Sequence, residues 1–318
     1  MSAPHHHHEA DHRALVYRDP ARFVQRIGAY LRDGLREGDR VMAAVTPEKR
    51  DWLREDLGTD AAAIDFADVG ELYWRHGPML ASLVAYLERH GTPGRGRVRV
   101  VAEQELTSRA AADVRAYMRY EAAFNVAYSQ FNASVLCPYD AERLPEAIIE
   151  DALRTHPDVL DNGGARRSEL FMDPRAFVRD RVHVRVVPAG VEPYGIERAE
   201  DVSGARALVR GQAQAAGLAT PAIQDLELAV SEVATNALEH GRAPRRVWSY
   251  VEDGELVCHV RDAGPGPPDP LTGYLPPDTR SLRGRGLWLA HQLCDIVEIA
   301  SDDAKNDVFL YVRVRAGG

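Results

Sequence analysis

The spacing of apolar and polar residues divides the first half of the chain into alternating helices and short strands. Residues 22–35 carry apolar side chains about one helical turn apart, at Phe23, Ile27, Leu31 and Leu35. Further helices are predicted over residues 48–57, 79–89 and 110–130. Short apolar runs typical of buried strands lie at residues 40–45, 62–66, 98–102 and 133–137. This alternation predicts a mainly parallel α/β sheet with helices on both faces.

The pattern changes over residues 174–195, where prolines and glycines punctuate a strand-like run at 182–187. Downstream, the sequence predicts two helices, a hairpin, a loop rich in proline and glycine, a helix that begins near Gly286, and two closing strands. This order favours an α/β sandwich in which helices cover one face of a mixed sheet. We therefore expect four segments: a flexible tail (1–11), a first domain (12–180), a linker (181–197) and a second domain (198–318).

Composition narrows the class of protein. The 318 residues are 45% hydrophobic and 27% charged, which is ordinary for a globular protein, and the formal net charge of −9 argues against a broad nucleic-acid-binding surface. The longest uncharged run, residues 122–139, contains too many polar side chains for a membrane span. Three cysteines cannot form a disulfide framework, which favours a cytoplasmic protein. The run His5–His8 allows metal binding, a cloning remnant or a natural tail.

The second half contains three segments with candidate chemistry. Glu232 and Asn236 are four residues apart on a predicted helix and therefore share a face, where they could hold Mg²⁺ or accept a proton; a solvated polar face is the alternative. Asp262 ends a predicted strand and precedes a glycine-containing loop. Gly284 and Gly286 open a helix whose first N–H groups could bind phosphate, although such a glycine pair alone could be a turn.

The three segments, taken in this order, resemble the motifs of a known protein family. The stretches SEVATNALEHG, VRDAGPG and GRGLWLAHQLCD follow one another within residues 198–315. Together they resemble the GHKL (Bergerat) ATP-binding fold that gyrase and histidine kinases share, and they are most similar to bacterial anti-sigma-factor serine/threonine kinases. The resemblance implies ATP and Mg²⁺ as cofactors.

The resemblance also implies a role for each residue at the matching positions. Asn236 corresponds to the magnesium ligand that bridges the ATP phosphates, and Glu232 to the acidic residue that polarises the attacking hydroxyl. Asp262 corresponds to the aspartate that accepts a hydrogen bond from the adenine amino group, and Gly264 and Gly266 shape the adjoining wall.

The lid and the next-to-last strand complete the comparison. Gly284 and Gly286 correspond to the glycines of the ATP lid, and Arg283 and Arg285 flank them within reach of a phosphate or remain solvated. The family commonly has a Gly-Thr pair on the next-to-last strand, where this chain reads KNDV at residues 305–308. The missing threonine and the added carboxylate predict weakened ATP binding.

Two functions from different classes follow from the resemblance. In the first, the protein controls a partner, a sigma factor or an anti-anti-sigma protein, and phosphorylates a serine or threonine of the anti-anti-sigma protein. In the second, a degenerate ATP domain sequesters that partner without catalysis. A histidine kinase is disfavoured because the loop-rich residues 174–195 stand where a helical hairpin with a phosphoacceptor histidine would be required. No direct nucleic-acid contact is expected, and a homodimer is possible.

The first half resembles two known folds. Residues 34–45 resemble the run before the phosphate loop of RecA-like ATPases, but residues 46–50 lack the glycines and the Lys-Ser/Thr pair of a P-loop. Four stretches resemble the DcmR-type sensory (MEDS) domain over residues 10–175, namely residues 12–17, 120–125, 136–140 and 155–157. The expected fold is therefore a RecA-like parallel α/β sandwich without a P-loop, and the expected role is sensory.

A sensory site is predicted where a buried strand ends. Cys137, Tyr139, Asp140 and His156 lie at the edge where open α/β sheets bind ligands. A buried cysteine followed by proline turns is the alternative. Cysteines and histidines do not recur at the close spacing that would predict zinc from sequence.

Overall fold

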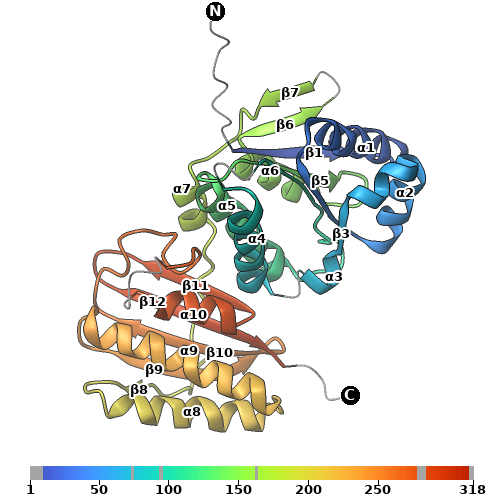
Figure 1. Cartoon of the computed structure of the whole chain (residues 1–318). Helices are drawn as coiled ribbons and strands as arrows, with labels where there is room; N and C mark the ends of the chain where they lie inside the picture. Colours follow the sequence, from blue (N-terminus) through green and yellow to red (C-terminus); the bar gives the residue numbers. More distant parts are fainter. Residues whose placement is uncertain (1–9, 73–74, 93–95, 162–163, 278–283, 315–318) are drawn as a thin grey trace, which may run out of the picture. The chain divides into compact units, whose positions relative to one another are not determined.

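The computed structural model describes residues 10–72, 75–92, 96–161, 164–277 and 284–314. They form two compact units, one built from residues 10–72 and 79–177 and the other from residues 75–78 and 178–314. Each unit has its own sheet, as Figure 1 shows. Each also has its own hydrophobic core.

The amino-terminal sheet has seven strands in the order β3-β2-β4-β5-β1-β6-β7. Their bounds are β1 (Asp11–Tyr17), β2 (Arg40–Val45), β3 (Asp65–Asp68), β4 (Val98–Ala102), β5 (Ala133–Asp140), β6 (Asp158–Asp161) and β7 (Gly164–Arg167). All neighbours pair in parallel except β6 and β7, which pair antiparallel. The predicted parallel α/β sheet is therefore confirmed, with one antiparallel edge strand.

Helices lie on both faces of this sheet. The elements are α1 (Pro20–Glu37), α2 (Pro47–Leu57), a 3-10 helix η1 (Gly58–Ala63), α3 (Val69–Leu72), α4 (His76–His90), α5 (Ala111–Tyr128), α6 (Glu146–Thr155) and α7 (Pro174–Asp180). Figure 1 shows α1 and α2 on one side of the strands and α4 and α5 on the other. Because side chains alternate along a strand, Leu136 of β5 packs with the α1 core, whereas its neighbours Val135 and Cys137 face the opposite layer.

Helix α1 shows how the local sequence sets an element. The Asp19 carboxylate accepts a hydrogen bond of 2.8 Å from the backbone N–H of Arg22, and Pro20 occupies the first turn. Gly38 ends the helix in the left-handed conformation (φ 78°). Between these caps, Phe23, Ile27 and Leu31 of the predicted stripe are fully buried, and Leu35 is partly buried.

Two features of this sheet differ from the sequence prediction. Strand β1 lies between β5 and β6, although the sequence predicted a tail that continued to residue 11 and no strand at 11–17. The sequence DHRALVY begins with polar residues and therefore lacks the apolar run of a buried strand. In the structure, however, the polar His12 is buried. The strand expected at 62–66 begins at Asp65 instead, because residues 58–63 form the 3-10 helix.

The carboxy-terminal sheet has five strands in the order β11-β12-β10-β9-β8. Their bounds are β8 (Tyr194–Gly195), β9 (Arg246–Glu252), β10 (Glu255–Asp262), β11 (Ile296–Ser301) and β12 (Asn306–Arg313). In the described residues every pairing is antiparallel, so the expectation of a mixed sheet is wrong. The reason is local: β9 and β10 form a hairpin through Asp253 and Gly254, both with positive φ, and β11 and β12 are likewise consecutive antiparallel strands.

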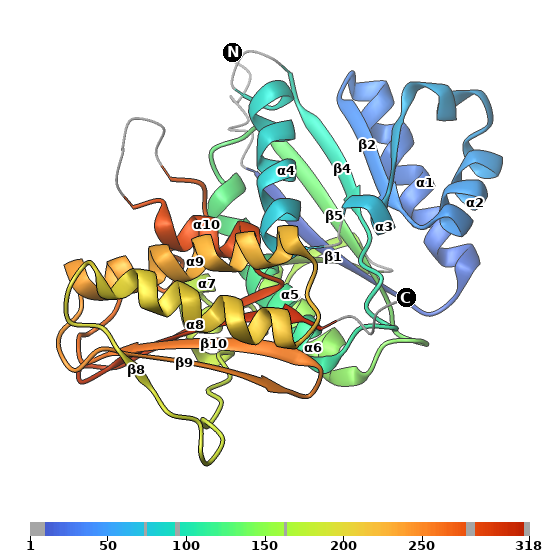
Figure 2. The same ribbon diagram turned by 90° about the horizontal axis from the view of Figure 1, so that it is seen from below.

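Three helices cover one face of this sheet, as Figure 2 shows: α8 (Asp201–Ala215), α9 (Thr220–Glu239) and α10 (Gly286–Leu293). Val209 of α8 and Val230 of α9 are fully buried in one core with Leu256, Cys258 and Val260 of β10. Strict alternation puts Leu256 and Cys258 toward the helices, with His259 and Arg261 on the other face.

The second face of the same sheet is partly covered by the segment that the sequence predicted as a linker. The expected strand at 182–187 is wrong, because these residues pair with no described strand. Arg185 is largely buried and donates hydrogen bonds to Glu252 (3.0 Å) and Glu255 (2.6 Å). Its guanidinium also lies over the ring of Tyr311 at 5.2 Å. These contacts fix the segment to the sheet.

Candidate functional site

A cavity of about 370 Å³ opens between α9, the end of β10, the start of α10 and β12. This volume lies within the range of small-molecule sites in proteins. Segments far apart in the sequence supply its wall, including Val233, Asn236, Ala237, Asp262, Gly266, Gly284, Gly286, Leu287, Asn306 and Val308. The three sequence segments singled out for their chemistry therefore converge on one cavity.

Helix α9 presents the first of these segments. Its apolar stripe packs on the sheet, so Asn236, one turn after Glu232, faces the cavity. A Cβ atom built on Gly286 would lie 2.8 Å from Oε2 of Glu232 and 3.0 Å from Nδ2 of Asn236, which puts both side chains beside the start of α10. Arg245 holds the end of α9 by donating to the carbonyl of Ala237 at 2.7 Å.

Asp262 lies at the opposite wall, at the end of β10, and is 2% exposed. Its Oδ1 accepts a hydrogen bond of 2.7 Å from the backbone N–H of Gly264, and its Oδ2 accepts one of 3.0 Å from Nδ2 of Asn306. A carboxylate has about four acceptor positions, so these bonds orient Asp262 and leave it able to accept from a ligand.

The glycines beside Asp262 have little room for a side chain. A Cβ atom on Gly264 would lie 2.7 Å from Oδ1 of Asp262. Gly266 has φ 70°, and a Cβ atom there would lie 2.2 Å from Oγ of Ser301. Both positions therefore require glycine in this arrangement, and Gly266 itself lines the cavity.

The departure at residues 305–308 has a different consequence from the one expected. Asn306 bonds Asp262, so its amide supplies the donor that the missing threonine hydroxyl would have supplied. Asp307 points to the other face of the sheet, where its fully buried carboxylate contacts His259 (2.6 Å) and Arg261 (2.5 Å). The expectation of an added carboxylate beside the cavity is therefore wrong, because adjacent residues of a strand face opposite sides.

The ionisation of the buried Asp307 carboxyl is controlled by His259 and Arg261. Burial raises the pKa of Asp307, but hydrogen bonds from His259 and Arg261 outweigh it and hold the pKa below its ordinary value. Burial lowers the pKa of His259 despite the nearby carboxylate. His259 is therefore a neutral donor to Asp307, stacked between Trp248 and Phe309.

Two of the remaining predicted residues are described, at the start of α10. Gly284 lines the cavity with φ 82°, and Arg285 is exposed at the start of α10. Arg283 lies outside the described residues, as does the run His5–His8.

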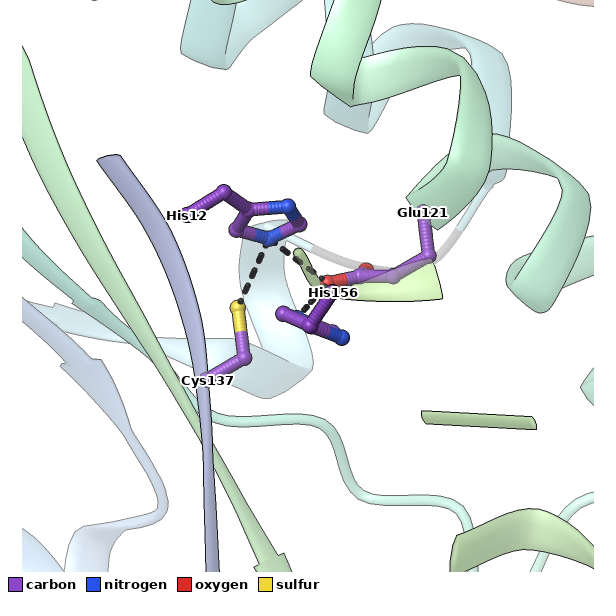
Figure 3. Close-up of side chains that lie close together, drawn as sticks. All are labelled: His12, Glu121, Cys137 and His156. Atoms are coloured by element: carbon purple, nitrogen blue, oxygen red, sulfur yellow. Dashed lines mark hydrogen bonds and ion pairs between the residues drawn. The ribbon is translucent and has the colours of Figure 1, made fainter. Parts of the chain in front are cut away.

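The amino-terminal unit divides the predicted sensory residues between two places. Cys137 and His156 come together in a buried cluster with His12 and Glu121 (Figure 3), and the ring of Tyr139 packs edge-on against His156. Asp140 instead lines a separate cavity of about 300 Å³ at the carboxyl ends of the parallel strands. His12 and Glu121 were not among the predicted site residues.

The second cavity occupies the place where a P-loop would lie. Lys49 and Glu103 form a buried ion pair there, and Glu103 also accepts a hydrogen bond of 3.1 Å from the backbone N–H of Thr46. The lysine is thus neutralised within the protein rather than presented to a phosphate. This agrees with the loss of the P-loop that the sequence indicated.

Family models match both units. Residues 11–157 match the MEDS domain, the methanogen/methylotroph, DcmR sensory domain, and residues 197–312 match the histidine kinase-like ATPase domain. The chain is a MEDS domain followed by a histidine kinase-like ATPase domain. In the ATPase domain the cavity lies among Asn236, Asp262 and Gly286, and in the MEDS domain the buried cluster joins β1, α5, β5 and the end of α6.

Other comparisons add little to these two matches. Among solved structures, the RsbU and RsbW domains of a Mycobacterium tuberculosis protein match at 23% identity with a TM-score of 0.29. The match covers 38% of this chain and 32% of that chain, so the present chain spans about a third of its length. No curated protein matches. Among the described residues of both domains, no helix has the length and apolar character needed to cross a membrane.

Proposed function

We propose that the ATPase domain binds ATP with Mg²⁺ and transfers its terminal phosphate to a serine or threonine of a protein partner. The observation that carries the proposal is the meeting of Asn236, Asp262 and Gly286, from three separate segments, around one cavity of about 370 Å³. Motif order alone could arise in unconnected loops, whereas these residues share one cavity whose volume suits a small-molecule ligand.

Asp262 would recognise the adenine. Its carboxylate is buried, oriented by Gly264 and Asn306, and able to accept a hydrogen bond from an exocyclic amino group. Guanine presents a carbonyl oxygen at that position, so a carboxylate would repel it. Val260 and Val308 line the cavity beside Asp262 and supply an apolar wall for the purine.

Asn236 and Gly286 would form the phosphate end. The amide oxygen of Asn236 is a suitable Mg²⁺ ligand, and the absence of a side chain at Gly286 leaves room between α9 and α10. Mg²⁺ would neutralise charge on the phosphates. The first N–H groups of α10 and the exposed Arg285 are positioned to add favourable charge at this end. Gly284 lines the same side, and Arg283 would be its neighbour in the lid.

Glu232 would accept the proton of the attacking hydroxyl. It lies one turn before Asn236 on the same face of α9 and beside Gly286. Phosphoryl transfer needs positioning and charge stabilisation more than covalent chemistry, so one carboxylate near the phosphate end is sufficient as a base.

The partner would be a sigma factor or an anti-anti-sigma protein, and the MEDS domain would regulate the reaction in response to its own ligand. The protein would act in the cytoplasm, where ATP and sigma factors are found, and it could act as a homodimer. The resemblance to anti-sigma-factor kinases supports this assignment, together with the match to the ATPase family.

The alternative is an ATPase-type domain that binds its partner without phosphoryl transfer. The missing Gly-Thr pair was the main support for it, and the bond from Asn306 to Asp262 weakens that support. The alternative remains distinct from the kinase because it requires neither Glu232 nor transfer of labelled phosphate.

The test uses the full chain in two stages. Calorimetry with Mg·ATP measures binding to the wild type, to Asn236→Ala, and to Thr235→Ala as an exposed neighbour on the same helix. ATP labelled at the terminal phosphate is then added with fractions of native cytosol, with Glu232→Gln compared against Glu239→Gln, a carboxylate exposed near the end of α9.

The outcomes separate the two functions. Binding that is weakened by Asn236→Ala, with label on a second polypeptide that is lost in Glu232→Gln alone, supports the kinase. Binding without any transfer supports the non-catalytic alternative. No binding at millimolar ATP would contradict both the kinase and the assignment of the cavity to ATP.

A further inference from the structure

Four side chains with metal-binding atoms meet inside the MEDS domain. His12 comes from β1, Glu121 from α5, Cys137 from β5 and His156 from the end of α6, and all four are at least 95% buried. One donor atom from each lies within 4.8 Å of the others. Figure 3 shows the imidazole of His12 facing the thiol of Cys137 and the carboxylate of Glu121.

The hydrogen bonds of His12 fix which of its nitrogens carries the proton. The Asn125 amide group donates to the carbonyls of Glu121, Ala122 and Thr155, at 3.3, 3.2 and 2.8 Å. Its Oδ1 therefore faces Nδ1 of His12, at 3.0 Å, and must accept a hydrogen bond from it. In the neutral imidazole, the lone pair is then on Nε2, which points into the cluster.

His156 is fixed in the same tautomer by a different partner. Its Nδ1 donates to the backbone carbonyl of Ala152 at 2.7 Å, which leaves the lone pair of the neutral ring on Nε2. Nε2 lies 3.0 Å from Oε1 of Glu121 but without the alignment of a hydrogen bond.

Glu121 is oriented from its other oxygen. Oε2 accepts a short hydrogen bond from the hydroxyl of Tyr117, so Oε1 is the atom that faces the two imidazoles. Oε1 and the Nε2 atoms of His12 and His156 are thus three acceptors at close range.

The geometry points to a divalent metal ion at the centre of this cluster, and we propose that the MEDS domain binds one Zn²⁺ through His12, Glu121, Cys137 and His156. Three acceptor atoms so close together repel one another unless a cation lies between them. Two neutral imidazoles, a carboxylate and a thiolate carry a total charge of −2, which Zn²⁺ balances.

The separations agree with tetrahedral zinc. Zn–N and Zn–O distances near 2.05 Å give edges of about 3.3 Å, and a Zn–S distance near 2.3 Å gives an N···S edge of about 3.5 Å. The Nε2 atoms of His12 and His156 lie 3.2 and 3.0 Å from Oε1 of Glu121, and Nε2 of His12 lies 3.4 Å from Sγ of Cys137. A small rearrangement would bring all four into coordination.

The surroundings support the same conclusion. Three of the four ligands have an outer partner that orients them: Asn125 for His12, the Ala152 carbonyl for His156 and Tyr117 for Glu121. A cavity of about 20 Å³, enough for one water or ion, adjoins His12, Glu121 and Cys137 and is otherwise mostly apolar. The competing explanation is a single proton shared among the imidazoles and the carboxylate.

The test loads metal into the full chain. His5–His8 are replaced by serine in every sample, because a run of histidines binds divalent ions itself. The protein is stripped with a chelator, reloaded with Zn²⁺ or Co²⁺ and desalted, and metal is counted by mass spectrometry. Cys137→Ala is compared with Cys258→Ala, which removes a buried cysteine from the other domain. Asn125→Ala removes the side-chain oxygen that accepts a hydrogen bond from Nδ1 of His12.

The proposal expects about one equivalent of Zn²⁺ per chain and a Co²⁺ spectrum with tetrahedral bands and a thiolate charge-transfer band. Cys137→Ala should lose that band while Cys258→Ala keeps it. Asn125→Ala should bind Zn²⁺ about 10- to 100-fold more weakly. If Cys137→Ala fails to fold, a Cys258→Ala/Cys294→Ala variant that keeps the band assigns it to Cys137, the sole remaining thiol.

Two results would overturn the zinc site. A reloaded chain that retains no metal would leave the shared proton as the explanation of the cluster. A thiolate band that persists in Cys137→Ala would locate the metal elsewhere.

Discussion

The side-chain amide of Asn306 donates a 3.0 Å hydrogen bond to the buried carboxylate of Asp262, across neighbouring strands β12 and β10. The bond joins a residue of the stretch that lacks the family's Gly-Thr pair to the residue that we propose binds the adenine. A hydrogen bond to a charged group is worth about 1.5–3 kcal/mol when it is buried. Asn306 is therefore expected to support nucleotide binding rather than to weaken it.

Replacement of Asn306 tests that relationship. Asn306→Ala should weaken Mg·ATP binding about tenfold, the equivalent of roughly 1.4 kcal/mol, because Asp262 loses an orienting donor. Asn306→Thr should bind within about threefold of the wild type, since a hydroxyl can donate to the same oxygen. Calorimetry measures both, with Asp303→Asn in the same hairpin as the control. Equal affinities for Asn306→Ala and the wild type would mean that the bond has no role in the site.

Gly286 provides a steric test of the phosphate end. In Gly286→Ala the new methyl group would meet Glu232 at 2.8 Å and Asn236 at 3.0 Å, so Mg·ATP binding should weaken by about tenfold or more. Gly211→Ala is the matched control, because a methyl group at that position on α8 meets nothing within 4 Å. That control should keep ATP affinity and gain up to about 1 kcal/mol in stability. Unchanged affinity in Gly286→Ala would remove α10 from the proposed site.

Replacement of Arg185 tests whether residues 181–197, the expected linker, are held against the ATPase domain. Arg185→Ala removes hydrogen bonds to Glu252 and Glu255 and the contact with Tyr311, so stability should fall by about 1–3 kcal/mol. Proteases should also cut residues 181–193 faster. Limited proteolysis with mass spectrometry measures this, and Arg206→Ala on α8 serves as control. Equal cleavage in both variants would show that the segment is not held by Arg185.

The lowered pKa of His259 predicts how the stability of the ATPase domain depends on pH. Its pKa is lowered by burial, so the unfolded chain takes up a proton near pH 6.5 before the folded chain does. Stability is therefore fully present above about pH 6.5 and is lost as pH falls below it. The lowered pKa of Asp307 adds a further loss in more acidic solution, below its ordinary value of 3.8.

Urea unfolding of the full chain at pH 7.5 and 5.5, roughly one unit either side of that value, measures the effect. The midpoint should fall at the lower pH. His259→Gln retains a donor for Asp307 but cannot titrate, so its midpoint should fall less. His240→Gln, at an exposed histidine, should behave as the wild type. A midpoint that changes equally in all three proteins would exclude His259 as the cause.

Sequence patterns predicted the relative placement of candidate residues when these residues lie on the same helix or strand. The spacing of Glu232 and Asn236 placed both on one face of α9, and the apolar stripe of that helix fixed which face meets the sheet. A Cβ atom built on Gly264, Gly266 or Gly286 would lie less than 3 Å from a neighbouring side-chain atom. Because the motifs are continuous, short-range rules were sufficient to find them.

Features that depend on distant partners could not be predicted in the same way. The direction of Asp307 follows from the phase of β12, which is set by Asp262 and Asn306 pairing across the sheet. His12 and Glu121 are 109 residues apart, and their meeting depends on strand order rather than on spacing. The close spacing used to search for zinc sites therefore missed a cluster assembled by the whole MEDS domain.

The assignment of Asp262 to adenine is the claim on which the proposed function depends. Calorimetry of the full chain with Mg·ATP and Mg·GTP tests it, using Asp262→Asn and, as an exposed carboxylate in the β9–β10 turn, Asp253→Asn. The wild type and Asp253→Asn should prefer ATP by about 10- to 100-fold, the equivalent of a charged hydrogen bond, and Asp262→Asn should lose that preference. Equal binding of ATP and GTP by the wild type, or an unchanged preference in Asp262→Asn, would contradict the account.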